Sequence, residues 1–410
     1  MTKTFPLEKA DELPVWRRPI TLLFLMALAM PIAFNTWSVL LNNFVIEVGG
    51  FDGSDIGWLH TVREIPGFLA VGVIAIIIFI REQVLGMVSL VLLGAATMVT
   101  AYFPSMAGIL TITMLSSIGF HYYETVNQSL QLQWLSKDRA PQILGWLISA
   151  GSLVTLVAYL LIVLLWRRLD LDFTVVYMIG GGLTVLIALF CLFAYPSFES
   201  ATPQVKKMIL RKRYWLYYAL QFMAGARRQI FVVFAAFMMV EKFGFAVDEI
   251  ASLYLLNLVV TIIVAPLIGK AVSVWGERSA LIVEYTGLTI VFLMYGGLYW
   301  FGWGVVLASV LYIVDHTLFA MALALKTYFQ KIADPQDIAP TAAVAFTINH
   351  IAAVFLPAGL GYLWLVSPSA VFTVAACMAI GSLLLSLLIP RHPEKGNETV
   401  FPRLNSVAEG

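Results

Sequence analysis

The chain has few charged residues and almost no cysteine. Only 12% of its 410 residues are charged, about half of the roughly 25% that is usual in soluble domains. A net charge of +1 gives no electrostatic footprint for a nucleic acid. The two cysteines, Cys191 and Cys377, each lie within an apolar run. We therefore expect buried packing residues, and neither a disulfide framework nor a metal cluster.

Familiar catalytic signatures are also missing. The sequence contains no HExxH, no serine-nucleophile motif and no phosphate-binding glycine loop. This argues against an enzyme, and no cofactor is expected. The polar start of the chain leads into an apolar run that is too long for a signal peptide and has no small-residue cleavage site. We expect this run to be a first membrane span.

Long apolar runs fill the rest of the chain, of which 60% is hydrophobic. Crossing a bilayer takes roughly 20 apolar residues. The runs predict twelve transmembrane helices in two pseudo-symmetric bundles of six. The first six are expected at about Pro19–Ile46, Ser54–Ile80, Val84–Phe103, Ser105–Trp134, Pro141–Trp166 and Phe173–Tyr195. The second six are expected at Tyr214–Val240, Glu249–Gly269, Ser279–Phe301, Trp303–Lys326, Thr341–Leu365 and Ser369–Ile389.

A basic linker divides the two sets. Residues 196–213 contain the stretch KKMILRKR, which suits contact with anionic lipid headgroups. We predict an N-terminal bundle over 1–195, a C-terminal bundle over 214–389 and a disordered cytoplasmic tail over 390–410. Lysine and arginine gather in loops on the side of both termini, and the opposite side holds only Arg167, Arg168 and Lys242. This bias places both termini in the cytoplasm of a bacterial-type inner membrane. We expect a monomer in the lipid bilayer.

An internal repeat supports the division. The segment FVIEVGGFDGSDIGWL after the first helix resembles FMMVEKFGFAVDEIASL after the seventh. When the two halves are aligned at one constant spacing, Gly50 corresponds to Gly244 and Asn35 corresponds to Gln229. Two related halves are typical of a transporter built from repeats.

The chain resembles the major facilitator superfamily over essentially its whole length. The family's loop motif, G-x-x-x-D-R-x-G-x-R, has a partial match in GKAVSVWGER, where Gly269, Gly276 and Arg278 fit and Ser273 and Val274 replace the acid and the base. The first half keeps almost nothing of it. The resemblance implies alternating access, with Gly269, Gly276 and Arg278 in a conformational loop. The fifth predicted helix, Pro141–Trp166, contains the stretch GWLISAGSL from Gly145 and lacks the Gly-Pro antiporter motif of many drug exporters in the family.

Ionisable residues within spans are costly, so they are functional candidates. In the second helix His60, Arg63 and Glu64 share one face at helical spacing. An internal Arg63–Glu64 pair that only fixes packing is the alternative. We predict proton coupling for His60 and Glu64 and substrate binding for Arg63.

The fourth helix is the most polar, with a stripe that must line water or other protein: His121, Glu124, Asn127, Gln128 and Gln131. Histidine titrates near neutrality, and burial moves a glutamate toward it. We predict proton coupling for His121 and Glu124. A structural hydrogen-bond network is the alternative.

The second half offers further groups. Arg227, Arg228 and Gln229 lie near the middle of the seventh helix, and adjacent residues there diverge by about 100°. We expect one arginine to face the cavity and bind substrate and the other to pair with a neighbouring helix. Asp315 and His316 in the tenth helix are candidates for proton coupling.

Further polar residues complete the candidates. Asn349 and His350 in the eleventh helix, together with Asn35 and Gln229, are predicted to bind substrate. Glu284 and Lys326 lie near predicted helix ends, where long side chains can reach headgroups, and receive less weight. The resemblance implies that helices 1, 4, 7 and 10 line the cavity, beside 2, 5, 8 and 11.

The charged residues predicted to lie deep within the spans nearly cancel in net charge, because there are three arginines and three carboxylates. They are Arg63, Arg227 and Arg228, and Glu64, Glu124 and Asp315. Protonation of a carboxylate would release an arginine, which binds carboxylate or phosphate groups bidentately. The leading hypothesis is a proton-coupled secondary transporter of a small anionic organic solute.

Alternatives remain open. Intramembrane histidines and carboxylates are plausible ligands for a metal or metal-chelate transporter: His60, His121, His316 and His350 with Glu124 and Asp315. A membrane-embedded enzyme, or a sensor without transport activity, belongs to another class.

Overall fold

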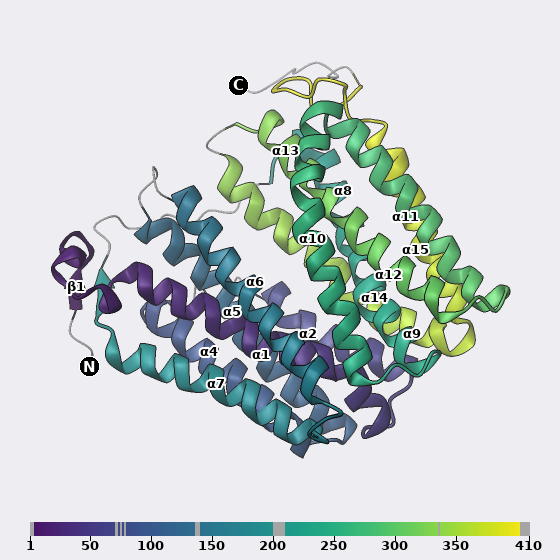
Figure 1. The fold of residues 1–410 in the computed structure, drawn as a ribbon. Coiled ribbons are helices and arrows are strands. Elements are labelled where there is room, and N and C mark those ends of the chain that lie inside the picture. Colours follow the sequence, from purple (N-terminus) through teal and green to yellow (C-terminus); the bar gives the residue numbers. More distant parts are fainter. Residues whose placement is uncertain are drawn as a thin grey trace. The chain divides into compact units, whose positions relative to one another are not determined.

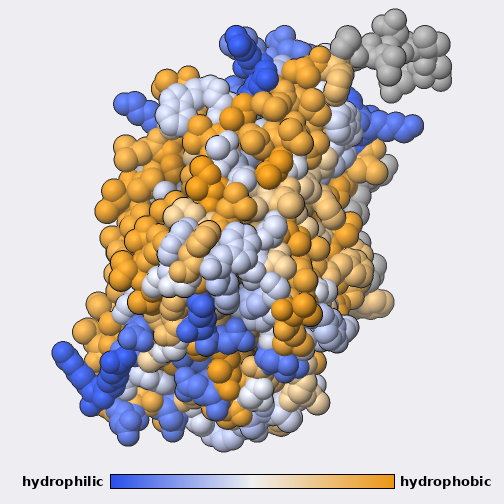
Figure 2. All heavy atoms as spheres, turned by 90° about the vertical axis from the view of Figure 1, so that its right-hand side faces the viewer, coloured by the Kyte–Doolittle hydropathy of each residue, from blue (hydrophilic) through white to orange (hydrophobic). Residues whose placement is uncertain are grey.

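The protein is mostly helical and crosses the membrane several times. A computed structural model describes residues 4–69, 73, 76, 77, 79–135, 140–199, 210–334 and 337–401. Within these ranges, ten helices are long and apolar enough to span a bilayer. The predicted all-helical membrane class is confirmed at this level, and the arrangement as two bundles of six helices stays a prediction. The face drawn in Figure 2 is largely hydrophobic, with hydrophilic residues toward its upper and lower ends.

The chain forms two compact units, each considered by itself. The first comprises Met1–Val205 and Val240–Leu255, and the second comprises Lys206–Met239 and Leu256–Gly410. The long helices of the first unit (Figure 1) are α1 (Pro19–Glu47), α2 (Gly53–Phe68), α4 (Glu82–Val99), α5 (Met106–Trp134), α6 (Ala140–Leu165) and α7 (Phe173–Ala194). Five of these lie within a few residues of the predicted spans. The exception is α2, because Phe79 and Ile80 of the predicted span Ser54–Ile80 are not helical.

Polar caps set the starts of several helices. The Asp52 carboxylate accepts hydrogen bonds from the backbone N–H groups of Ser54 and Asp55, and Asp55 accepts one from Asp52, which forms a capping box at α2. Ser105 caps α5 and Asp172 caps α7 in the same way. These caps satisfy N–H groups that the first helical turn leaves without a partner.

Small residues let α4 and α7 approach closely. A Cβ atom on Gly94 would lie 2.7 Å from the carbonyl oxygen of Gly181, and one on Gly181 would lie 2.3 Å from that of Gly94. Membrane helices have no hydrophobic drive to associate, so such close van der Waals packing is an important source of their cohesion. The contact fixes α4 and α7 as the scaffold on which α1 and α5 pack.

Two short strands close the first unit at one end. β1 (Thr4–Pro6) pairs in parallel with β2 (Ser197–Glu199), so the start of the chain meets the residues just after α7. Gln83 at the start of α4 joins them, donating to Pro196 O at 2.8 Å and accepting from the backbone N–H of Phe198 at 2.9 Å. The apolar pattern of the helices could not predict this pairing.

The segment Val240–Leu255 belongs to the first unit by its contacts. Asn43 donates to Phe245 O at 2.7 Å, and Arg167 pairs with Asp248 at 2.8 Å. Gly50 and Gly244, which the repeat aligned, both have positive φ, at 65° and 68°. Both therefore occupy the left-handed region that glycine favours, which supports the repeat.

The second unit carries the remaining helices. They are α8 (Trp215–Ile230), α9 (Ala236–Glu241), α10 (Val247–Trp275, which begins in the first unit), α11 (Glu277–Trp300), α12 (Val305–Phe319), α13 (Leu323–Ile332), α14 (Ile338–Val366) and α15 (Pro368–Ser386). Two predicted continuous spans are interrupted. A π-helical turn (η6, Phe231–Ala235) separates α8 from α9, and a 3-10 turn (η7, Ala320–Ala322) separates α12 from α13. The predicted turn at Gly302 is present, with a φ of 66°.

The tail is ordered where the structure describes it, so the prediction of disorder is wrong for residues 390–401. Lys395 pairs with Asp334 at 2.5 Å, and the Tyr328 hydroxyl donates to Glu398 O at 2.6 Å. The backbone N–H of Val400 also donates to Leu388 O at 2.9 Å. Polar composition alone did not reveal these partners. The final nine residues of the predicted tail lie outside the described residues.

Candidate functional site

An ion pair on α2 forms the centre of the polar group in the first unit. The Arg63 guanidinium donates to Oε1 of Glu64 from Nε at 3.1 Å and from Nη2 at 2.6 Å. Both side chains are largely buried, 15% and 5% exposed. His60, one turn earlier, is also buried. The internal pairing that sequence reasoning left open is therefore present, and it neutralises both groups in this state.

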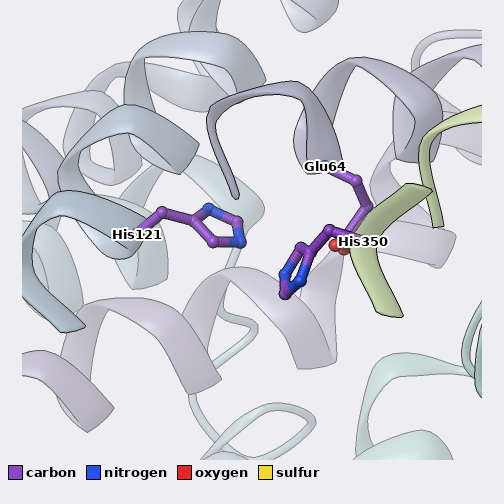
Figure 3. A group of neighbouring side chains, drawn as sticks. All are labelled: Glu64, His121 and His350. Carbon is purple, nitrogen blue, oxygen red and sulfur yellow. The ribbon is translucent and has the colours of Figure 1, made fainter. Parts of the chain in front are cut away.

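His121 of α5 lies beside this pair. One of its ring nitrogens and a Glu64 carboxylate oxygen lie within 4.8 Å of each other. Figure 3 shows the two side chains reaching from their helices into the same space. His121 Nδ1 lies 3.0 Å from both Oγ and O of Ser117, and the Ser117 hydroxyl donates to Arg63 O. Side chains from α2 and α5 are thus held in one hydrogen-bonded group.

The rest of the polar stripe on α5 divides into separate environments. Glu124 is half-buried one turn after His121, and Gln128 is exposed. Farther along, Glu82 at the start of α4 accepts from Ser129 at 3.1 Å and from Gln133 at 2.6 Å. Sequence reasoning missed this second group, because Ser129 and Gln133 lie off the stripe that begins at His121.

Asn35 joins α1 to α6. Its amide donates to the Thr155 hydroxyl at 2.8 Å, and its carbonyl oxygen accepts from Tyr159 at 3.2 Å. Nearby, the rings of Phe34 and Phe120 stack with centroids 4.5 Å apart. In this state the predicted substrate-binding amide therefore has internal partners, and the aromatic pair packs α1 against α5.

The second unit encloses a charged group of its own. Arg227 of α8 is 1% exposed, and its Nη1 lies 3.8 Å from Oε1 of Glu284 on α11, which is also 1% exposed. The guanidinium carbon lies 4.4 Å above the Tyr285 ring, and Nε donates to Met223 O at 3.3 Å. The expectation that Glu284 reaches toward headgroups is wrong, because this side chain points into the interior.

Asp315 of α12 is the third member of this group. It is fully buried, and it interacts electrostatically with Arg227 and Glu284. Neither of its oxygens has a hydrogen-bond partner among the residues that the structure describes. His316, the next residue, is exposed, with its ring 6.2 Å from that of Phe231. The two neighbours predicted together thus lie in different environments.

Of the two adjacent arginines, Arg228 is the more accessible. Arg228 is half-buried, whereas Gln229 is buried with Arg227. On α14, Asn349 donates to Gln221 O at 3.3 Å, and His350 Nδ1 lies 2.8 Å from Phe346 O. The predicted polar residues of this unit therefore fall into a buried charged cluster and a separate α8–α14 contact.

The predicted conformational loop is mostly helical. Gly269 lies within α10, which continues to Trp275, and Arg278 lies in the first turn of α11. Only Gly276 leaves the helix, with a φ of 77°, where it precedes α11. Glu277 pairs with Lys331 of α13 at 2.7 Å. The motif thus forms a tight turn between two long helices.

The two cysteines differ from each other. Both are free; Cys191 is buried as predicted, whereas Cys377 is exposed. The expectation of a buried Cys377 is wrong because the outward face of α15, like its core face, is apolar. An apolar helix in a membrane protein does not reveal which of its faces is buried.

Comparisons with known proteins identify a family from the sequence and similar folds among solved structures. The model of the Major Facilitator Superfamily matches residues 19–357. The crystal structure of the nucleoside transporter NupG is similar with a TM-score of 0.72 and 14% identity, covering 90% of this chain and 98% of that one. A bacterial homologue of the human lysosomal transporter Spinster, inward-facing and occupied, is similar with a TM-score of 0.68 and 11% identity, covering 93% of this chain and 98% of that one. No curated protein sequence matches the chain.

Proposed function

Because the chain belongs to the major facilitator superfamily, a family of membrane transporters, we propose that it moves a small anionic organic solute by alternating access, coupled to protons. Its family and its structural neighbours make it a membrane transporter of a small molecule and not an enzyme. The finer assignment rests on one observation. Arg63, Glu64 and His121 form a buried group in which a cation is held by a carboxylate beside a histidine.

The Arg63–Glu64 pair makes anion binding depend on a proton. While Glu64 is ionised, its carboxylate forms an ion pair with the Arg63 guanidinium at 2.6 Å, and an incoming anion must displace the carboxylate. When Glu64 takes up a proton, Arg63 loses its charged partner in a buried setting, which is costly. A carboxylate or phosphate group on the solute then replaces Glu64, because guanidinium binds such groups bidentately.

His121 provides a second proton-carrying group beside the pair. Imidazole changes charge near neutral pH, and its ring lies within 4.8 Å of the Glu64 carboxylate. The hydrogen-bond contacts between Nδ1 and Ser117 fix the orientation of the imidazole ring. One proton taken up per negative charge bound makes transport of a monovalent anion electroneutral.

The remaining candidates take supporting roles in this proposal. Glu124 lies one turn from His121 and carries protons toward it. Both termini lie in the cytoplasm of a bacterial-type inner membrane, and the protein acts as a monomer.

Metal ions and nucleosides are two other solute classes that a ligand-binding test would detect. Glu64 and His121 offer one oxygen and one nitrogen to a metal ion, but Arg63 beside them repels a cation. NupG is named a nucleoside transporter. A likeness at 14% identity supports the fold alone, and an uncharged nucleoside has no need of a paired arginine.

The test is ligand binding by the purified protein at two pH values. A thermal-shift screen with carboxylates, phosphate esters, nucleosides and divalent metals identifies the ligand, because binding stabilises the folded state. We expect an anion that binds more tightly at the lower pH.

Arg63→Lys, which keeps the charge but loses the planar fork, should bind this anion at least roughly tenfold more weakly. The matched control is Arg168→Lys, an exposed arginine in the first unit. Preferential binding of a metal or a nucleoside, or equal affinity of both variants, contradicts the proposal.

A further inference from the structure

The interior of the second unit holds an unbalanced set of charges. Arg227 comes from α8, and Glu284 and Asp315 come from the consecutive helices α11 and α12. The three residues are 1%, 1% and 0% exposed. Arg227 lies 3.8 Å from Glu284 and interacts electrostatically with Asp315, and the three side chains are closed to solvent. If all three groups were ionised, one negative charge would lie in the apolar interior without compensation.

The neighbouring ionisable groups do not supply the missing charge. Tyr285 lies under the Arg227 guanidinium, and Tyr295 interacts with Asp315, but both are neutral donors. Arg278 is half-buried at the start of α11. On α13, which follows α12, Lys331 pairs with Glu277 and Lys326 is exposed. Arg228 diverges from Arg227 by about 100° around α8, and His316 is exposed.

Several buried polar atoms of the cluster also lack a hydrogen-bond partner among the described residues. Within the described part of the chain, Glu284 Oε2, both oxygens of Asp315, Arg227 Nη1 and the Tyr295 hydroxyl have no hydrogen-bond partner. A buried carboxylate that is charged and unbonded is far more costly than a neutral carboxylic acid. Two carboxylates in one site resolve this by sharing a proton.

We propose that Glu284 and Asp315 share one proton beside Arg227, and that this cluster is a second proton-binding site, within the second unit. One carboxyl group is neutral, and the other is the counter-ion of Arg227. All three members of this site belong to the second unit, whereas Arg63, Glu64 and His121 belong to the first. Its role in coupling rests on the proposed function, whereas its occupancy by a proton does not.

The helices that carry the cluster are interrupted next to it. The π-helical turn Phe231–Ala235 follows α8 four residues after Arg227, and the 3-10 turn Ala320–Ala322 follows α12 five residues after Asp315. Such irregular turns often mark functional hinges in membrane and soluble helices. Movement at these turns would expose a proton that is sealed in the present state, so that exchange accompanies a conformational change.

Infrared difference spectroscopy of the purified protein tests the site without a transported solute. Wild type at neutral pH should show the carbonyl band of a protonated carboxyl group in an apolar setting. Glu284→Gln and Asp315→Asn should each remove this band, because either change leaves one carboxylate for Arg227. The matched control, Glu8→Gln in the exposed N-terminal segment, should leave the band unchanged. Arg227→Gln should retain or strengthen the band, because both carboxyl groups then become neutral.

The outcomes separate this inference from the proposed function. A band that is absent from the wild type, or that survives both single substitutions, overturns the proton site. So does a sodium-dependent rise in melting temperature that either substitution abolishes, since the cluster would then bind a metal cation. If the band behaves as expected but solute binding is independent of pH, the site stands and the proposed coupling fails.

Discussion

Replacement of Gly225 by alanine should destabilise the protein strongly, because α8 and α14 touch there. A Cβ atom on Gly225 would lie 2.3 Å from Asn349 O and 3.0 Å from Asn349 C, whereas ordinary van der Waals contact begins at 3.4 Å. These atoms are backbone, so they cannot rotate away, and the helices must separate by about 1 Å. Overpacking of this kind costs about 1–3 kcal/mol, and alanine recovers about 1 kcal/mol through its helix propensity. Because the clash is with backbone, the cost lies at the upper end of this range, about 3 kcal/mol, which leaves a net loss of about 2 kcal/mol.

A matched control isolates the steric effect. Gly359 lies on α14 itself, is exposed, and has open space where a Cβ atom would be. Gly359→Ala gains the same helix propensity without a clash, so its melting temperature in detergent should equal or exceed that of the wild type. The assay is thermal unfolding of the three proteins under one set of conditions. If Gly225→Ala melts no lower than the wild type, the close packing of α8 on α14 is not as the structure has it.

Three further predictions concern the tail, coupling and topology. The hydrogen bond from Lys395 is the largest cause that lowers the pKa of Asp334 below its usual 3.8, and with that from Arg213 it outweighs the opposing effect of burial. Lys395→Ala should therefore lower the melting temperature at neutral pH, and its difference from the wild type should vanish as the pH falls below about 3.8. Thermal unfolding over a pH series measures this difference, and a difference that grows toward acid contradicts the prediction. Glu124→Gln should abolish proton-driven transport in proteoliposomes while solute counterflow survives better, and equal loss of both indicates a structural or substrate-binding role. Cysteine at Asp172, introduced without the native cysteines, should react with an impermeant reagent from outside, and cysteine at Glu277 from inside; the reverse pattern refutes the topology.

Several helix bounds could be predicted because a membrane span depends mainly on the length of an apolar run. The first span was predicted to start at Pro19 and end at Ile46, and α1 ends one residue later, at Glu47. The fourth was predicted to end at Trp134, where α5 ends. The repeat was also visible, because Gly50 and Gly244 are required by the same backbone conformation.

The direction of side chains was harder to predict. Glu284 lies in a helix whose faces are all apolar, so the sequence pattern does not distinguish the core face from the lipid face. Its partner Arg227 lies 57 positions earlier in the chain, and only the fold brings the two together at 3.8 Å. A buried carboxylate near a helix end can be inferred only when its distant partner is known.

Local irregularities were not predictable for a similar reason. The π-helical turn after α8 and the 3-10 turn after α12 occur in apolar segments without proline or glycine. The order of the tail depends on Lys395 meeting Asp334 across the unit, a contact that composition does not encode. In each case tertiary packing decides a conformation that local sequence leaves open.

The most direct test of the central claim is uphill uptake of the identified anion into proteoliposomes under an imposed pH gradient. The Arg63–Glu64 pair should make wild-type accumulation depend on that gradient. Glu64→Gln, which permanently mimics the protonated carboxyl group, should still exchange the solute across the membrane but fail to concentrate it. Accumulation that is insensitive to the gradient in the wild type, or that persists in Glu64→Gln, would contradict proton coupling through this pair.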